Sequence, residues 1–104
     1  MNYFRQGDLS FTPIKKLPEN LKIVLSSILA LGENTGHKHQ LLERVEQQFQ
    51  VLEDEKGIKY LSINQPTDLV HEEHKTITIQ PGFYWMQNER EYDYFTLEVN
   101  RVQD

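Results

Sequence analysis

The sequence predicts an all-β fold, a small barrel or sandwich, on three observations. Short segments alternate apolar and polar residues, as strands with one buried face do. Turn residues separate these segments at a spacing of roughly ten residues, which is typical of sandwiches and barrels. The chain is 104 residues long, which suits one domain. We therefore expect a single β-barrel domain over residues 1–104.

The first third of the chain contains turn signals and short apolar runs. Gln6-Gly7-Asp8 predicts a turn, and Leu9 begins an alternating segment. Pro13 lies within that segment and indicates a weak strand or a strand at a sheet edge. The range Leu21–Glu33 is rich in aliphatic residues and ends near a glycine. We expect one or two strands there, with a largely buried face.

The segment Leu41–Leu52 allows two interpretations. Its apolar residues have helical spacing, and its Glu, Gln and Leu residues form helices readily. As a strand, the segment would place Val45, Phe49 and Val51 on one face. Glu55-Lys56-Gly57 then predicts a hairpin into a second strand that begins near Ile58. The hairpin gives a strand its partner, so we favour the strand.

The last third of the chain contains a second group of predicted strands. Ile77 and Ile79 alternate with polar residues, and Pro81-Gly82 predicts a turn. An aromatic strand follows over residues 83–86, and residues 92–99 fit a last strand or a short helix. The aromatic side chains are expected in the core or at a homodimer face. They are Phe83, Tyr84, Trp85 and Tyr92.

Composition excludes several classes of function. The formal net charge is −5 and no basic cluster occurs, which disfavours binding to nucleic acids or to anionic membranes. The chain has no cysteine, so disulfides and thiolate zinc sites are excluded. The longest apolar stretch, Leu21 to Leu31, is too short and polar to span a bilayer. No signal peptide is recognisable at Met1, and we expect a soluble, cytoplasmic protein.

The four histidines occur in two tight motifs, and this is the most informative feature of the sequence. His37 and His39 are two residues apart, so on a strand both imidazoles point to one face. Such a pair can bind one divalent metal ion. Glu43 would share that face if the strand continued, and would add a carboxylate ligand. Zinc is the first candidate, and iron, manganese and nickel suit the same donors.

The second motif, His71-Glu72-Glu73-His74, has a different spacing. Residues three apart face opposite sides of a strand, so either one histidine joins the site or the segment bends between them. Three protein ligands would leave a position open for catalysis, and four would close a structural site. Glu72 and Glu73 are expected to support the imidazoles or to face solvent.

The segment from Gly32 through His37 and His39 to Glu43 resembles the first motif of cupins, which are small double-stranded β-helix barrels. Pro81-Gly82, before the aromatic strand, is similar to the start of the second cupin motif. The resemblance implies metal ligation by His37, His39 and Glu43. Cupins carry a further histidine after that turn, where this chain has none. We expect His71 or His74 to replace it.

The histidine motifs, together with Gln6-Gly7-Asp8 and Arg90-Glu91-Tyr92, also resemble a small bacterial and phage family without an assigned function. The first functional expectation is a metal-binding protein with the ion on His37, His39 and at least one of His71 and His74. If one coordination position stays open, the ion would act on a small molecule. Hydrolysis and oxygen chemistry both fit such an ion. A second expectation is a non-enzymatic interaction module that a structural ion staples. A third is a metal-free, pH-sensitive interface.

Overall fold

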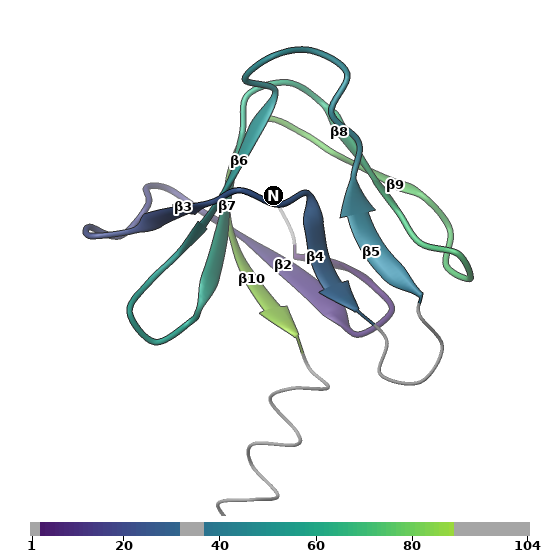
Figure 1. Ribbon diagram of the computed structural model, residues 1–104, viewed down its shortest axis with the longest axis horizontal. Helices are drawn as coiled ribbons and strands as arrows, with labels where there is room; N and C mark the ends of the chain where they lie inside the picture. Colours follow the sequence, from purple (N-terminus) through teal and green to yellow (C-terminus); the bar gives the residue numbers. More distant parts are fainter. Residues whose placement is uncertain (1–2, 32–36, 89–104) are drawn as a thin grey trace, which may run out of the picture.

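The structure is a computed structural model that describes residues 3–31 and 37–88. These residues form ten β-strands in two antiparallel sheets, as the sequence predicts, and no helix occurs among them (Figure 1). The described residues accordingly contain no helix that could cross a membrane. The strands are β1 Phe4–Gln6, β2 Leu9–Ile14, β3 Lys22–Val24, β4 Ile28–Leu31, β5 Lys38–Leu41, β6 Phe49–Glu53, β7 Lys59–Ile63, β8 Thr67–Val70, β9 Ile77–Ile79 and β10 Gly82–Asn88.

The larger sheet has six strands in the order β1-β2-β10-β7-β6-β3, and the smaller has four in the order β4-β5-β8-β9. This architecture is consistent with a small sandwich or barrel. Chain segments that are distant in sequence pair at its centre, where β10 lies between β2 and β7. The two histidine motifs lie at one end of the smaller sheet, at β5 and just beyond β8.

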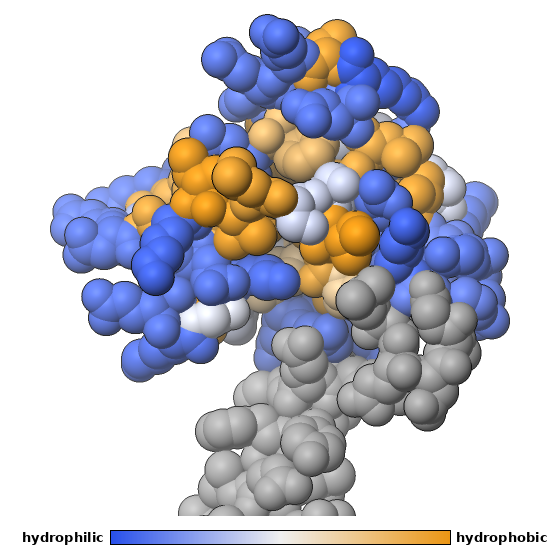
Figure 2. All heavy atoms as spheres, in the orientation of Figure 1, coloured by the Kyte–Doolittle hydropathy of each residue, from blue (hydrophilic) through white to orange (hydrophobic). Residues whose placement is uncertain are grey.

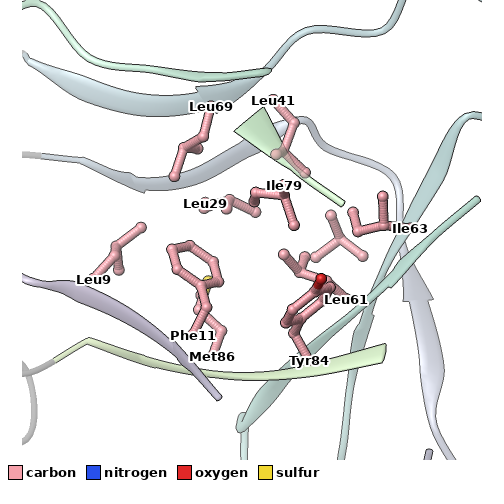
Figure 3. Packing of buried hydrophobic residues seen from close by; sticks show 11 residues of the cluster. Leu9, Phe11, Leu29, Leu41, Leu61, Ile63, Leu69, Ile79, Tyr84 and Met86 are labelled. Atoms are coloured by element: carbon pink, nitrogen blue, oxygen red, sulfur yellow. The ribbon is translucent and has the colours of Figure 1, made fainter. Parts of the chain in front are cut away.

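The core lies between the inner faces of the two sheets (Figure 3). Alternation within each strand sends every second side chain inward, and burial of these apolar groups drives the packing. The smaller sheet contributes Leu29, Leu41, Leu69 and Ile79, and the larger contributes Leu9, Phe11, Val51, Leu61, Ile63, Tyr84 and Met86. The core therefore fixes the positions of β5 and β8, the two strands at which the histidine motifs lie.

The turn predicted at Gln6-Gly7-Asp8 and the hairpin predicted at Glu55-Lys56-Gly57 are both confirmed. Gly7 has φ +58° in the turn between β1 and β2. Gly57 has φ +86° in the turn between β6 and β7, where Asp54 Oδ1 accepts hydrogen bonds from the amides of Lys56 and Ile58. Pro13 pairs with β10 and lies beyond the part of β2 that pairs with β1. β2 is not an edge strand, because it lies between β1 and β10.

The prediction of one continuous strand over Leu41–Leu52 is wrong, and so is the helix. Leu41 ends β5 in one sheet, and Phe49 begins β6 in the other. Between them the chain turns, with Gln47 at φ +58°. The buried Gln48 side chain accepts the amide of Arg44 at 2.6 Å and donates to the Pro66 carbonyl at 3.0 Å. This buried amide holds a turn that hydrophobic spacing does not reveal.

The segment Leu21–Glu33 forms two strands, β3 and β4, which belong to different sheets. Leu29 is buried, as expected for this segment, whereas Ile23 is 57% exposed. The aromatic strand is β10, and it alternates between the core residue Tyr84 and the exposed Phe83 and Trp85. Residues 92–99 and Arg90 lie outside the described residues.

The visible surface of the molecule carries hydrophobic residues in several groups, with hydrophilic residues around them (Figure 2). The most exposed large apolar side chain among the described residues is Leu25, at 96%. Phe83 and Trp85 are only about one-third exposed, at 36% and 37%. The expectation of a homodimer through the aromatic strand stays a prediction.

Candidate functional site

The register of β5 and β8 brings the two histidine motifs together. Gln40 lies opposite Val70 in this antiparallel pair. One residue farther along the same register, His39 lies opposite His71, and directly opposed residues share a face of a sheet. The ring centroids of His39 and His71 are 4.4 Å apart. The pairing therefore places a histidine of each motif on the inner face.

The two carboxylates of the second motif, Glu72 and Glu73, contact residues of the first motif. Glu72 Oε2 accepts a hydrogen bond from the Lys38 backbone N–H at 2.8 Å. Glu73 Oε1 lies 3.3 Å from Nδ1 of His37. The hydrogen bond from Lys38 is the main reason that the pKa of the Glu72 carboxyl is lowered. The carboxylates thus connect the two motifs, and that of Glu73 lies beside an imidazole.

All four imidazole rings lie close together, and we call them the four-imidazole group: His37, His39, His71 and His74. The His71 centroid is 4.4 Å from that of His39, 4.5 Å from that of His74 and 5.7 Å from that of His37. His39 and His74 are 6.1 Å apart with nearly parallel rings. The segment bends after β8, so both His71 and His74 reach the group, which answers the spacing question that the sequence leaves open.

Gln6 orients the most buried ring of the group. Its Nε2 donates to the carbonyl oxygens of Leu69 and Lys75, both at 2.9 Å. Because carbonyls only accept, these two bonds place the amide oxygen of Gln6 toward His39, where it lies 2.9 Å from Nδ1. An amide oxygen accepts, so Nδ1 of His39 carries the hydrogen. In the neutral ring the lone pair is therefore on Nε2.

The buried position of His39 also keeps its ring neutral. The residue is 7% exposed. Burial, and then the proximity of His71 and His74, lowers the pKa of His39 from 6.5 to about 4. Asp8 and Glu72 act in the opposite direction but do not outweigh these effects. At neutral pH, His39 is therefore an unprotonated imidazole with a defined tautomer, which is the form that binds metal ions.

His37 presents the same tautomer for a different reason. Glu73 Oε1 lies 3.3 Å from Nδ1 of His37, and a carboxylate at this distance favours a hydrogen on that nitrogen. The neutral ring again has its lone pair on Nε2. A histidine ligand whose other nitrogen donates to a carboxylate or amide oxygen is a common arrangement around bound metals.

His71 has the opposite arrangement. Its Nδ1 accepts hydrogen bonds from the backbone N–H groups of Glu73 at 3.0 Å and His74 at 3.3 Å. Nδ1 therefore carries the lone pair, and the neutral ring has its hydrogen on Nε2. Burial, and then the nearby His74, lowers the pKa of His71. These two bonds hold the bend that carries His74 toward the other rings.

Gly7 provides space for the ring of His74. A Cβ atom added to Gly7 would lie 2.5 Å from Nε2 and 2.8 Å from Cδ2 of that ring. Any larger residue at Gly7 would displace the imidazole, and φ +58° independently favours glycine there. The turn Gln6-Gly7-Asp8 therefore contacts the four-imidazole group through its first two residues.

Glu43 does not share a strand face with His37 and His39, as predicted for a strand that continued to this residue. Strand β5 ends at Leu41, so the chain leaves the strand before Glu43, which is exposed. Across residues 3–31 and 37–88, no set of three or more His, Cys, Asp or Glu side chains is arranged to hold a metal ion as it stands. Nδ1 of His71 accepts hydrogen bonds from two backbone N–H groups, which direct its lone pair to the backbone and away from the other rings.

Gln6 and Gly7 are the residues of this site that the sequence reading did not assign. The sequence pattern predicts a turn there, which they form, and the motif resemblance that includes them implies no role for either residue. The signal was their presence in the same set of motifs as the histidines. Their contacts with His39 and His74 cross between the sheets, and nothing in the local pattern around position 6 reveals that partner.

An open hollow of about 240 Å³ lies beside the group on the outer face of β5 and β8. It is lined by Lys38, Gln40, Val70, His71 and Glu72. The alternation of β5 explains this lining, because Lys38 and Gln40 point away from the face that carries His39. His71 therefore borders both the four-imidazole group and the hollow.

Comparison with protein families gives one match, described as "Domain of unknown function (DUF8820)", over residues 5–89. That span contains Gln6, Gly7 and both histidine motifs. No curated protein matches the chain. No solved structure matches it either.

Proposed function

The chain belongs to the DUF8820 family, since the match spans most of its length, and we propose that it is a metal-binding domain. The ion is a divalent transition metal, with zinc as the first candidate and iron, manganese or nickel as alternatives. Its ligands come from His37, His39, His71 and His74. The single observation that carries the proposal is the buried His39, whose tautomer Gln6 sets and whose charge burial removes.

The spacing of the rings supports one shared ion. A tetrahedral ion that binds ring nitrogens at about 2.0–2.1 Å places the centroids of neighbouring rings about 5 Å apart. The distances from the His71 centroid to the other three centroids, and the distance between His39 and His74, run from 4.4 to 6.1 Å and so bracket this value. Binding of one ion would require side-chain rotations that direct the nitrogens to one point, because these side chains do not converge on an ion as they stand.

The hydrogen bonds around the rings support the same proposal. Bound imidazoles usually donate their second N–H to an oxygen. His39 does so to Gln6, and Nδ1 of His37 lies 3.3 Å from Glu73 Oε1. A histidine used only for packing or solubility would not need a buried amide held by two carbonyls. The chemistry that such an ion supplies is that of a Lewis acid or redox centre for a small molecule.

A non-enzymatic module stapled by the ion is the second candidate, and the contact between sheets favours it. Gln6 belongs to β1 in the larger sheet and His39 to β5 in the smaller one. An ion on His39 would therefore strengthen a junction of the two sheets. If this candidate is correct, metal removal should unfold the domain; if the ion serves a small molecule, the apo-protein should stay folded.

The test is metal content by plasma mass spectrometry on untagged protein. The native chain should bind about one equivalent of a transition metal. A His37→Ala/His74→Ala double variant should lose it, since both side chains reach the group without filling the core. Glu43→Gln is the matched control and should keep the metal. A native protein that stays metal-free after zinc, iron, nickel and manganese are each added would refute the proposal.

A further inference from the structure

We propose that His71 is not a metal ligand, and that His37, His39 and His74 hold the ion with one coordination position open. This inference rests on the proposed metal site and specifies its chemistry. The role of His71 is to hold the bend after β8 and to offer an N–H group beside the ion.

The hydrogen bonds of His71 are the first reason to infer that it does not bind the ion. Its Nδ1 accepts two backbone N–H groups, at 3.0 and 3.3 Å. Coordination through Nε2 would move the ring hydrogen to Nδ1, where it would point at those two N–H donors. Both amides would lose their partner and the bend would open. Keeping these bonds therefore keeps the lone pair of His71 away from the ion.

The second reason is that His37 and His39 have the opposite tautomer to His71. Nδ1 of His37 and Nδ1 of His39 each face an oxygen, and both rings have their lone pair on Nε2. His74 owes its position to the bend that His71 holds, because His74 N is one of the two amides bound. His71 thus acts on the site as a positioning residue through His74.

The location of His71 indicates what the open position takes. Its ring lies within 5.7 Å of each of the other three rings, so its Nε2–H is a hydrogen-bond donor within the group. The same residue lines the hollow of about 240 Å³, together with Lys38. A cationic ion and an N–H donor together suit a small anion with oxygen donors, such as a carboxylate.

The first experiment compares cobalt(II) binding by the native chain, His71→Asn and His74→Asn. Asparagine supplies a side-chain oxygen that accepts amides two and three residues ahead, so it can replace Nδ1 of His71 in the bend. His71→Asn should bind one cobalt with a Kd within about threefold of the native value. His74→Asn, the same chemical change three residues along, should bind at least tenfold more weakly.

His71→Ala tests the positioning role, since it removes the acceptor. It should weaken cobalt binding, and asparagine at the same position should restore it. If His71→Asn loses cobalt as fully as His74→Asn while remaining folded by circular dichroism, His71 is a ligand and the inference is overturned. If the native chain binds no metal at all, the proposed function itself fails.

The open position has its own test, with acetate as the probe. Acetate added to the cobalt-loaded native protein should change the visible d–d absorption of the ion, because a small anion enters the fourth position. A cobalt spectrum that acetate leaves unchanged would indicate four histidine ligands and overturn the inference.

Discussion

Oε1 of Gln6 lies 2.9 Å from Nδ1 of His39, and this contact joins the edge strand of one sheet to the histidine site of the other. The same Gln6 side chain binds two backbone carbonyls, so all three of its hydrogen bonds are committed. Because the amide N–H groups of Gln6 are bound to carbonyls, its oxygen faces His39 and defines the tautomer of that ring.

Gln6→Leu should weaken metal binding about 10- to 100-fold, because His39 loses the acceptor that fixes its tautomer. It should also lower the free energy of unfolding by about 1–3 kcal/mol, since buried polar groups lose their partner. Isothermal titration with zinc and urea unfolding measure the two effects. Gln48→Leu is the control: Gln48 is also buried and fully bonded but lies in the turn before β6. It should lose stability without weakening zinc binding, and equal loss in both variants would contradict the role of Gln6.

Gly7→Ala should cost more stability than Gly57→Ala, although both glycines have positive φ. Each substitution strains the backbone by about 1–2 kcal/mol. At Gly7 the new Cβ also meets the His74 ring at 2.5 Å, whereas at Gly57 nothing lies within 4 Å. The ring must move, which adds about 1 kcal/mol or more and lowers zinc affinity. Thermal unfolding and zinc titration of both variants test this, and an unchanged zinc affinity in Gly7→Ala would contradict it.

The metal-free protein should lose stability as the pH falls from 6.5 to about 4. Burial lowers the pKa of His39 from 6.5 to about 4, so the unfolded chain takes up this proton at a higher pH than the folded chain. The contribution of His39 is complete above pH 6.5 and is lost as the pH falls through this window. His71, whose pKa is also lowered, acts in the same direction.

Urea unfolding in the presence of EDTA, at steps between pH 7 and pH 4, measures this dependence. His39→Gln, which cannot titrate, should show a shallower loss over the same range. A profile as steep as that of the native protein would show that other groups cause the pH dependence.

Tyr84→Phe should lower the free energy of unfolding by about 1 kcal/mol, because the buried ring stays and the hydroxyl is lost. That hydroxyl donates to the Gln80 carbonyl at 2.7 Å across the turn between β9 and β10. Tyr60→Phe, on a half-buried ring of β7, is the control and should change stability by less than about 0.5 kcal/mol. Chemical unfolding compares them, and equal values would mean that the bond to Gln80 contributes nothing.

The strands and turns of this protein could be read from its sequence because their causes are local. Alternation sends Leu9 and Phe11 inward, and glycine at positions 7 and 57 permits the positive φ that each hairpin needs. The segment Leu41–Leu52 could not be read this way. Its turn depends on the buried Gln48, whose partners Pro66 and Thr67 are distant in sequence.

The histidine motifs show how far the site could be predicted from the sequence. The sequence by itself determined that all four imidazoles belong to two short motifs, and that His37 and His39 could share a face of a strand. Tertiary structure decided which side chains meet. The antiparallel register of β5 and β8 sets His39 against His71, and a bend held by backbone amides turns His74 toward the same rings. Gln6 reaches His39 only because the two sheets pack face to face, and the hydrogen bonds that select a tautomer depend on that packing rather than on local spacing.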